Sequence, residues 1–182
     1  WAPRLASLPR PLTALLVGGP TKPVRFDAAV AHDLATRAAA RRDGGTLYTT
    51  TSRRTPAAIA DALAAALPSG EPFFRWREGA TDNPYLALLG TADRFVVTSD
   101  SITMLVEVAR LGRPLAIYSL PPRGGAWWRR IASRRDLDAV PSLLVERGLA
   151  VRVGEPFEAV AEGVPDELDR VATRIRALFP AR

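Results

Sequence analysis

Apolar residues along the chain fall into short runs that alternate with longer segments of helical spacing. The first run, LTALLVGG at 12–19, ends in a glycine pair, which is typical of a buried parallel strand that leads into a tight turn. Later runs predict further strands at TLYTTTS, FFRWR, RFVVTS, LAIYSL and LAVRV. The segments between them predict helices at 27–42, 55–67, 83–89, 100–111, 137–147 and 165–179.

This alternation predicts an α/β fold, a doubly wound parallel sheet of the Rossmann-like class with helices on both faces. A chain of 182 residues is long enough for one well-cored domain and too short for two, so we expect a single domain at 12–182. Residues 1–11 contain three prolines, and we expect them to form an interdomain strap rather than the start of a core. Since the first residue is not Met, we expect the natural chain to be longer.

Composition excludes several classes of site. The sequence has no cysteine, so disulfides, thiolate metal sites and a cysteine nucleophile are excluded. A multi-histidine metal site is excluded as well because His32 is the only histidine, and we expect neither a metal nor a resident cofactor. No segment approaches the roughly 18 unbroken apolar residues of a membrane span, and the first residues lack the apolar stretch of a signal peptide. We therefore expect a cytoplasmic protein.

Basic residues give the chain a formal net charge of +6 at pH 7, and 24 of the 25 are arginines. This charge fits an anionic partner, but enrichment in arginine and alanine also fits a GC-rich genome. A nucleic-acid surface would need basic and aromatic residues interleaved on one face, and we expect no nucleic-acid partner. One segment does mix them, and it forms either a patch peripheral to the inner membrane or a cover for the sheet edge or for another domain: Trp127, Trp128, Arg129 and Arg130.

In an open α/β sheet, ligands bind beyond the carboxyl ends of the strands, near the point where the strand order reverses. The first strand runs into Gly18 and Gly19, where the missing side chains let backbone N–H groups approach an anion. The pair also fits a plain tight turn, since neither the G-x-G-x-x-G fingerprint nor a P-loop is present. The second strand runs into hydroxyls and guanidiniums at a helix start, which form either a phosphate cradle or a solvated surface: Ser52, Arg53, Arg54 and Thr55.

The fourth strand runs into a helix start that carries Asp100, Ser101, Thr103 and Met104, with Glu107 one turn further along. Helical spacing predicts that Asp100, Thr103 and Glu107 share one face. The two hydroxyls and the first-turn amides fit a diphosphate, and Glu107 fits the two hydroxyls of a ribose. The alternatives are that Asp100 is a simple N-cap and that Glu107 pairs with Arg110.

These motifs resemble two groups of known proteins. The glycine pair, Glu107 and the G-R-P at 112–114 resemble the C-terminal, nucleotide-sugar-binding half of GT-B-fold glycosyltransferases and the related sugar-nucleotide epimerases. A closer resemblance, over about residues 11–155, is to a family of bacterial and plant proteins named for the plant mitochondrial-fission adaptor (elongated mitochondria). The pattern of that family is read here in TTSRRTP at 50–56, NPY at 83–85, AD at 92–93 and VTSDSITMLVE at 97–107.

The resemblance implies a ligand and a function. It implies that Asn83 and Tyr85 join the site, that the ligand is a uridine-type nucleoside diphosphate or nucleotide-sugar, and that a further N-terminal domain completes the cleft. The chain would then be the donor half of a glycosyltransferase and inactive alone. The alternatives are half of a sugar-nucleotide epimerase and a non-catalytic protein-interaction module. No catalytic residue is assigned, because the sequence shows no nucleophile with a base beside it and no paired carboxylates.

Overall fold

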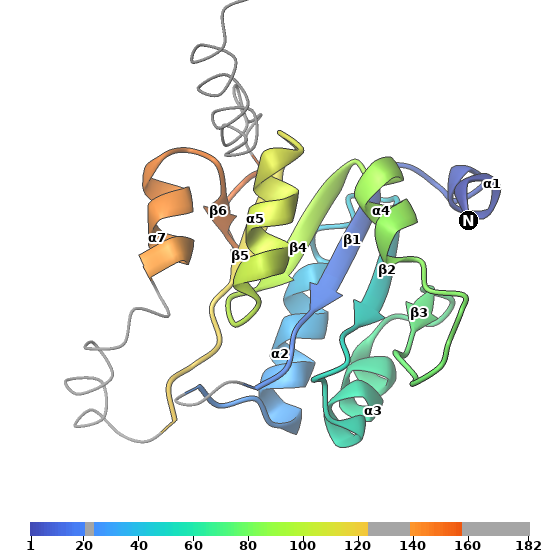
Figure 1. Ribbon diagram of the computed structural model, residues 1–182, viewed down its shortest axis with the longest axis horizontal. Coiled ribbons are helices and arrows are strands. Elements are labelled where there is room, and N and C mark those ends of the chain that lie inside the picture. The colour runs from blue at the N-terminus through green and yellow to red at the C-terminus, as the bar shows by residue number, and fades with distance from the viewer. Residues whose placement is uncertain (21–23, 124–138, 158–182) are drawn as a thin grey trace, which may run out of the picture.

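The computed structural model describes residues 1–20, 24–123 and 139–157. Its strands are β1 (Leu12–Val17), β2 (Thr46–Thr51), β3 (Phe73–Phe74), β4 (Arg94–Thr98), β5 (Leu115–Tyr118) and β6 (Val151–Arg152). Its helices are α1 (Ala2–Ala6), α2 (Ala28–Ala39), α3 (Ala57–Ala66), α4 (Tyr85–Thr91), α5 (Ile102–Arg110) and α7 (Ala139–Glu146). The strands form one parallel sheet in the order β3-β2-β1-β4-β5-β6 (Figure 1), which confirms the predicted α/β, doubly wound, Rossmann-like class.

β1 lies at the centre of the sheet, between β2 and β4. It pairs with β2 from Leu12 opposite Thr46 to Val17 opposite Thr51, and it pairs with β4 on its other side. All six residues of β1 are buried, which explains why the sequence there is an almost unbroken apolar run. Because the strand order reverses between β1 and β4, the switch point lies just beyond Val17.

Each face of the sheet has its own apolar core. Leu12, Ala14 and Leu16 of β1 belong to a core that also contains residues of α1, α4, α5 and α7. Leu15 and Val17 belong to a second core, which contains residues of α2 and α3. The alternation along β1 follows from the two-residue period of a strand, and it places helices on both faces as the sequence predicts.

The first residues differ from the expected strap. They include α1, in which Pro3 stands at the start of the helix, where its missing N–H removes no helical bond. Leu5 is fully buried in the first core, and α1 contacts α4. This part of the segment therefore belongs to the core, contrary to the expectation that it lies outside.

Some predicted element boundaries also shift. Pro56, not Thr55, is the N-cap of α3, and Ser101 is the N-cap of α5. Asp100 thus precedes the helix, and the prediction that it shares a helical face with Glu107 is wrong. The strand predicted at FFRWR shortens to β3. The segment with Trp127, Trp128, Arg129 and Arg130 and the helix expected at 165–179 lie outside the described residues.

Candidate functional site

The loop after β1 is tied to the ends of both neighbouring strands. On the β4 side, the N–H of Gly18 donates to the hydroxyl of Thr98 at 2.9 Å. On the β2 side, the hydroxyl of Thr55 donates to the carbonyl of Gly18, and the N–H of Ser52 donates to the carbonyl of Val17 at 3.0 Å. The three loops therefore meet at the switch point of the sheet.

Close packing requires glycine at both positions of this loop. A Cβ on Gly18 would lie closer than 3.0 Å to the carboxylate of Asp100, and a Cβ on Gly19 would lie closer than 3.0 Å to the backbone of Arg54. The glycine pair thus lets the β2–α3 and β4–α5 loops approach each other across the end of β1. Packing alone accounts for the pair, and its contact with a ligand stays a prediction.

The hydroxyls of the TSRRTP motif fold the loop, whereas its arginines face solvent. The N–H of Ser52 donates to Oγ1 of Thr55 at 3.0 Å, and the N–H of Arg54 donates to Oγ of Ser52 at 3.3 Å. Arg53 and Arg54 are exposed. The guanidinium of Arg54 lies 3.9 Å from the carboxylate of Asp100, so it spans from the β2–α3 loop to the β4–α5 loop.

Asp100 places a carboxylate among these loops. Its side chain is fully buried, and neither oxygen has a partner with hydrogen-bond geometry among the described residues. Burial raises the pKa of Asp100, because removal from water disfavours the charged form of a carboxylate. The hydroxyl of Thr98, the amide of Gly19 and the charge of Arg54 lie close enough to offset this effect in part.

Two helices begin at this edge without a side-chain cap. Neither Pro56 before α3 nor Ser101 before α5 accepts a hydrogen bond through its side chain from the first turn. The first-turn N–H groups of a helix carry the positive end of its dipole, which attracts anions. Of the other residues predicted here, Thr103 is exposed and Met104 packs against the first core, and the contact of Met104 with a ligand stays a prediction.

Glu107 on α5 is held by a residue of another helix. The hydroxyl of Tyr85 donates to Oε2 of Glu107. Burial, followed by the nearby Glu107, raises the pKa of Tyr85, so the phenol stays a neutral donor. Asn83 accepts the N–H of Tyr85 at 3.0 Å and so fixes the start of α4. Each carboxylate oxygen has two lone pairs, so Glu107 can accept further hydrogen bonds from a ligand.

The structure thus brings most of the predicted residues into two groups, and leaves Arg53, Ser101, Thr103 and Met104 outside both. Six of the predicted residues meet at the switch point and are called the loop cluster: Gly18, Gly19, Ser52, Arg54, Thr55 and Asp100. The second group is Asn83, Tyr85 and Glu107. Glu107 lies one turn beyond Thr103 on the same face of α5. Sequence reasoning missed Thr98, although a hydroxyl at the end of the fourth predicted strand was a visible signal.

Asp100→Asn is expected to change how stability depends on pH. The pKa of Asp100 is raised in the folded state, so its stabilising contribution is complete below about pH 4 and is lost as pH rises through the folded pKa. Asn cannot ionise, so the variant should lose less stability than the wild type as pH rises from about 4 to 7. Urea unfolding across this range measures the difference.

Asp33→Asn is the matched control, because the sign is opposite. Hydrogen bonds, first from Tyr118 and then from Arg37, lower the pKa of Asp33. Its contribution is therefore present above about pH 4 and is lost as pH falls through the folded pKa. Parallel pH profiles of Asp100→Asn and the wild type would contradict the account of Asp100.

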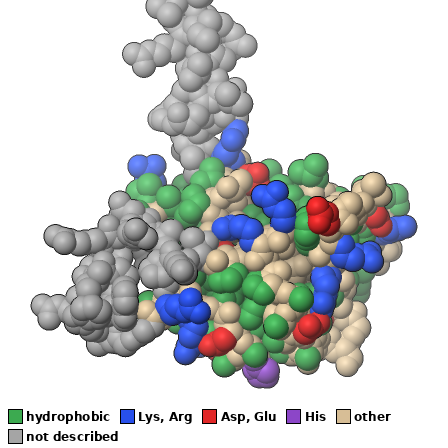
Figure 2. Space-filling view, turned by 60° about the horizontal axis from the view of Figure 1, so that its bottom comes forward, with side chains coloured by type: hydrophobic (Ala, Val, Ile, Leu, Met, Phe, Trp, Pro, Cys, Tyr) green, Lys and Arg blue, Asp and Glu red, His purple; other side chains and the backbone are tan. Residues whose placement is uncertain are grey.

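Basic side chains are scattered over the carboxyl edge. Figure 2 turns this edge toward the viewer and shows arginine side chains separated by hydrophobic and neutral surface. Within the described residues, no three His, Cys, Asp or Glu side chains come together as a metal site. In the same part of the chain, no helix has the length and apolar character needed to cross a membrane.

Comparison with known proteins identifies the family. Residues 1–179 match the family model described as Mitochondrial fission ELM1. The chain belongs to this family. The match confirms the resemblance drawn from the TSRRTP, NPY and VTSDSITMLVE motifs.

A relative with this name is the mitochondrial fission protein ELM1 of Arabidopsis thaliana, which is 28% identical over 187 residues. The aligned region covers 100% of this chain and 41% of that protein, so the chain spans less than half the length of this family member. Among solved structures, a glycotransferase of kitacinnamycin is similar with a TM-score of 0.35 and 12% identity. That likeness covers 76% of this chain and 41% of the other.

Proposed function

We propose that the chain binds a nucleoside diphosphate of uridine type, alone or as part of a nucleotide-sugar, at the carboxyl ends of β1, β2 and β4. One observation carries this proposal: α3 and α5 both begin at the switch point without a side-chain cap, and Arg53 and Arg54 stand beside them. A diphosphate there gains two helix dipoles and charge-assisted hydrogen bonds to the guanidiniums.

Asp100 makes ligand binding at this site depend on pH. A diphosphate beside the loop cluster meets the carboxylate of Asp100, and two negative charges in a partly buried site repel each other. The ligand should therefore bind more tightly when Asp100 is protonated, and burial raises the pKa of Asp100 in that direction. Arg54, which lies 3.9 Å from this carboxylate, is then able to turn its charge to the phosphate.

The second group of residues is assigned to the ribose. Glu107 lies five residues beyond Ile102, the first residue of α5, which corresponds to about 7.5 Å of rise along the helix. That distance suits a ribose that follows a phosphate at the helix start. A carboxylate accepts hydrogen bonds from both ribose hydroxyls, and the bond from Tyr85 keeps Glu107 oriented for them.

Glu107→Gln is expected to remove the preference for ribose over deoxyribose. We expect the wild type to bind UDP more tightly than 2′-deoxy-UDP by roughly tenfold, since a hydrogen bond to a charged group contributes about 1.5–3 kcal/mol. The variant should bind the two nucleotides almost equally, and Tyr85→Phe should reduce the ratio without abolishing it. Calorimetric titration of each protein measures these ratios. Equal ratios in all three proteins would remove Glu107 from the site.

Catalysis is assigned to the whole protein, as the donor half of a glycosyltransferase, and not to this chain alone. The chain covers 41% of its Arabidopsis relative, and no nucleophile with an adjacent base is present in the sites described above. A protein-interaction module is the second candidate, and the name of that relative, mitochondrial fission protein, is the observation that favours it. In that case the loop cluster would be a packing feature without a ligand.

A further inference from the structure

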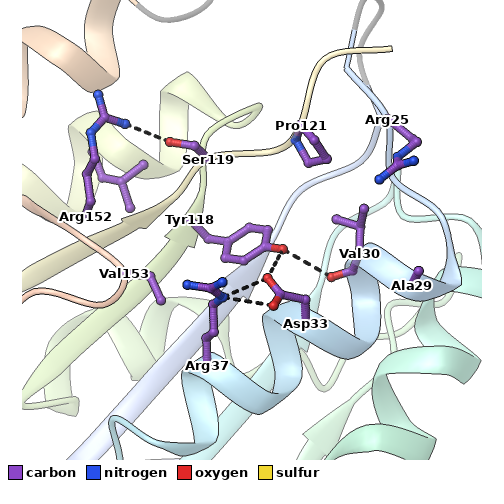
Figure 3. A pocket seen from close by; sticks show the side chains of 11 residues that line it. Arg25, Ala29, Val30, Asp33, Arg37, Tyr118, Ser119, Pro121, Arg152 and Val153 are labelled. Atoms are coloured by element: carbon purple, nitrogen blue, oxygen red, sulfur yellow. Dashed lines mark hydrogen bonds and ion pairs between the residues drawn. The ribbon is translucent and has the colours of Figure 1, made fainter. Parts of the chain in front are cut away.

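A cavity separate from the loop cluster lies between α2, β5 and β6. Its volume is about 430 Å³, within the range of small-molecule sites. Figure 3 shows side chains of α2 on one side, the end of β5 in the middle and β6 on the other side. Its floor is apolar, from Val30, Ile117, Val153 and the ring of Tyr118. The cavity can therefore hold a compact apolar group.

On one wall of the cavity, the charges of Asp33 and Arg37 neutralise each other. Asp33 accepts the hydroxyl of Tyr118 at 2.7 Å and the Nε of Arg37 at 2.9 and 2.8 Å. These hydrogen bonds, that of Tyr118 first, lower the pKa of Asp33, so the carboxylate stays charged and balances Arg37. Burial raises the pKa of Tyr118, which therefore remains a neutral donor. This wall contributes shape and no net charge.

The opposite wall carries Arg152, whose guanidinium has no ion-pair partner within the described ranges. Arg152 donates through Nη1 to the hydroxyl of Ser119 at 2.8 Å, so a neutral group fixes its guanidinium. Among the described residues, the guanidinium of Arg152 forms no ion pair, although Oε2 of Glu155 accepts the backbone N–H of Arg152 at 2.8 Å. Arg25, at the cavity mouth, does have such a partner, with its Nε 3.3 Å from Asp27. Of the three arginines in the lining, Arg152 is thus the one whose guanidinium has no ion pair among the described residues.

We propose that this cavity binds a small organic anion, with a carboxylate or phosphate-ester group on Arg152 and a compact apolar body on the floor. The guanidinium offers a paired set of donors to either acidic group, and the apolar floor distinguishes such a ligand from inorganic phosphate. The site uses none of the residues assigned to the nucleoside diphosphate, so it stands independently of that proposal.

Amide chemical shifts in two-dimensional NMR test the site, with phenyl phosphate, benzoate, inorganic phosphate and benzyl alcohol as probes. Phenyl phosphate and benzoate should produce saturable shifts centred on Ser119, Arg152 and Val153. Inorganic phosphate and benzyl alcohol, which each lack half of the recognised chemistry, should bind at least tenfold more weakly. Saturating UDP should not displace phenyl phosphate.

Variants distinguish binding in this cavity from nonspecific attraction of an anion to a basic protein. Arg152→Gln should weaken the binding of phenyl phosphate at least tenfold. Ala29 is an exposed residue of the cavity lining, and Ala29→Trp should block this binding. Arg147→Gln, which removes an exposed arginine outside the lining, should leave binding unchanged. The proposal is overturned if Arg152→Gln binds like the wild type, or if the shifts gather at residues 52–55 and 100–103 instead.

Discussion

Gly19→Ala should lower the free energy of unfolding by about 1–3 kcal/mol and weaken UDP binding at least tenfold. The new Cβ would overlap the backbone of Arg54, and a backbone cannot rotate away as a side chain can. The β2–α3 loop must therefore move, and Arg54 leaves its place beside Asp100. Urea unfolding measures the first effect, and calorimetric titration with UDP measures the second.

Gly90→Ala is the matched control. Gly90 lies in α4, and a Cβ there would meet no atom within 4 Å. Alanine favours a helix over glycine by about 1 kcal/mol, so this variant should be slightly more stable than the wild type and bind UDP equally well. If Gly19→Ala had the same stability and the same UDP affinity as the wild type, the loop would not depend on the close contact with Arg54.

Arg53→Ala combined with Arg54→Ala should weaken UDP binding by at least a hundredfold. Each guanidinium is assigned a charge-assisted hydrogen bond to phosphate, which contributes about 1.5–3 kcal/mol, or roughly tenfold or more in affinity. Arg53 is exposed and should contribute little to stability, whereas the loss of Arg54 beside the buried carboxylate of Asp100 should lower it. Titration calorimetry and urea unfolding separate the two effects.

Two further variants test whether UDP binding needs the guanidinium groups of Arg53 and Arg54 in particular. Arg53→Lys with Arg54→Lys keeps both charges but loses the paired donors of the guanidinium, so its UDP affinity should fall between those of the wild type and the double alanine variant. Arg147→Ala removes an exposed arginine that follows α7 and should have no effect on binding. If the domain is a protein-interaction module, all four proteins should respond to UDP in the same way.

The strands of this fold could be predicted from the sequence because the sheet is parallel and covered on both faces. Such strands are nearly continuous apolar or β-branched runs, and β1 and β2 are buried along their whole length. The exception is instructive. The strand predicted at FFRWR shortens to two residues. The N–H of Trp76 donates to the side chain of Thr51 at 2.9 Å, so it does not take part in the backbone hydrogen bonds of the sheet. No sequence pattern signals that choice.

The candidate site was less predictable, since local rules compete there with distant contacts. An Asp before a helix is normally an N-cap, yet Asp100 is buried beside Gly18, a residue of another strand end. Glu107 accepts the hydroxyl of Tyr85, a residue of α4 that is far from it in the sequence, and helical spacing along α5 could not reveal this contact. The cavity around Arg152 draws on three separate segments, so spacing along the chain could not reveal it.

A calorimetric titration of the wild-type chain with UDP, GDP and ADP tests the nucleotide site. We expect saturable binding of UDP, weaker binding of the other two, and an affinity for UDP that declines as pH rises through the pKa of Asp100. In Asp100→Asn this pH dependence should disappear while binding persists. No heat and no thermal stabilisation with any of the three nucleotides at millimolar concentration would contradict the nucleotide site.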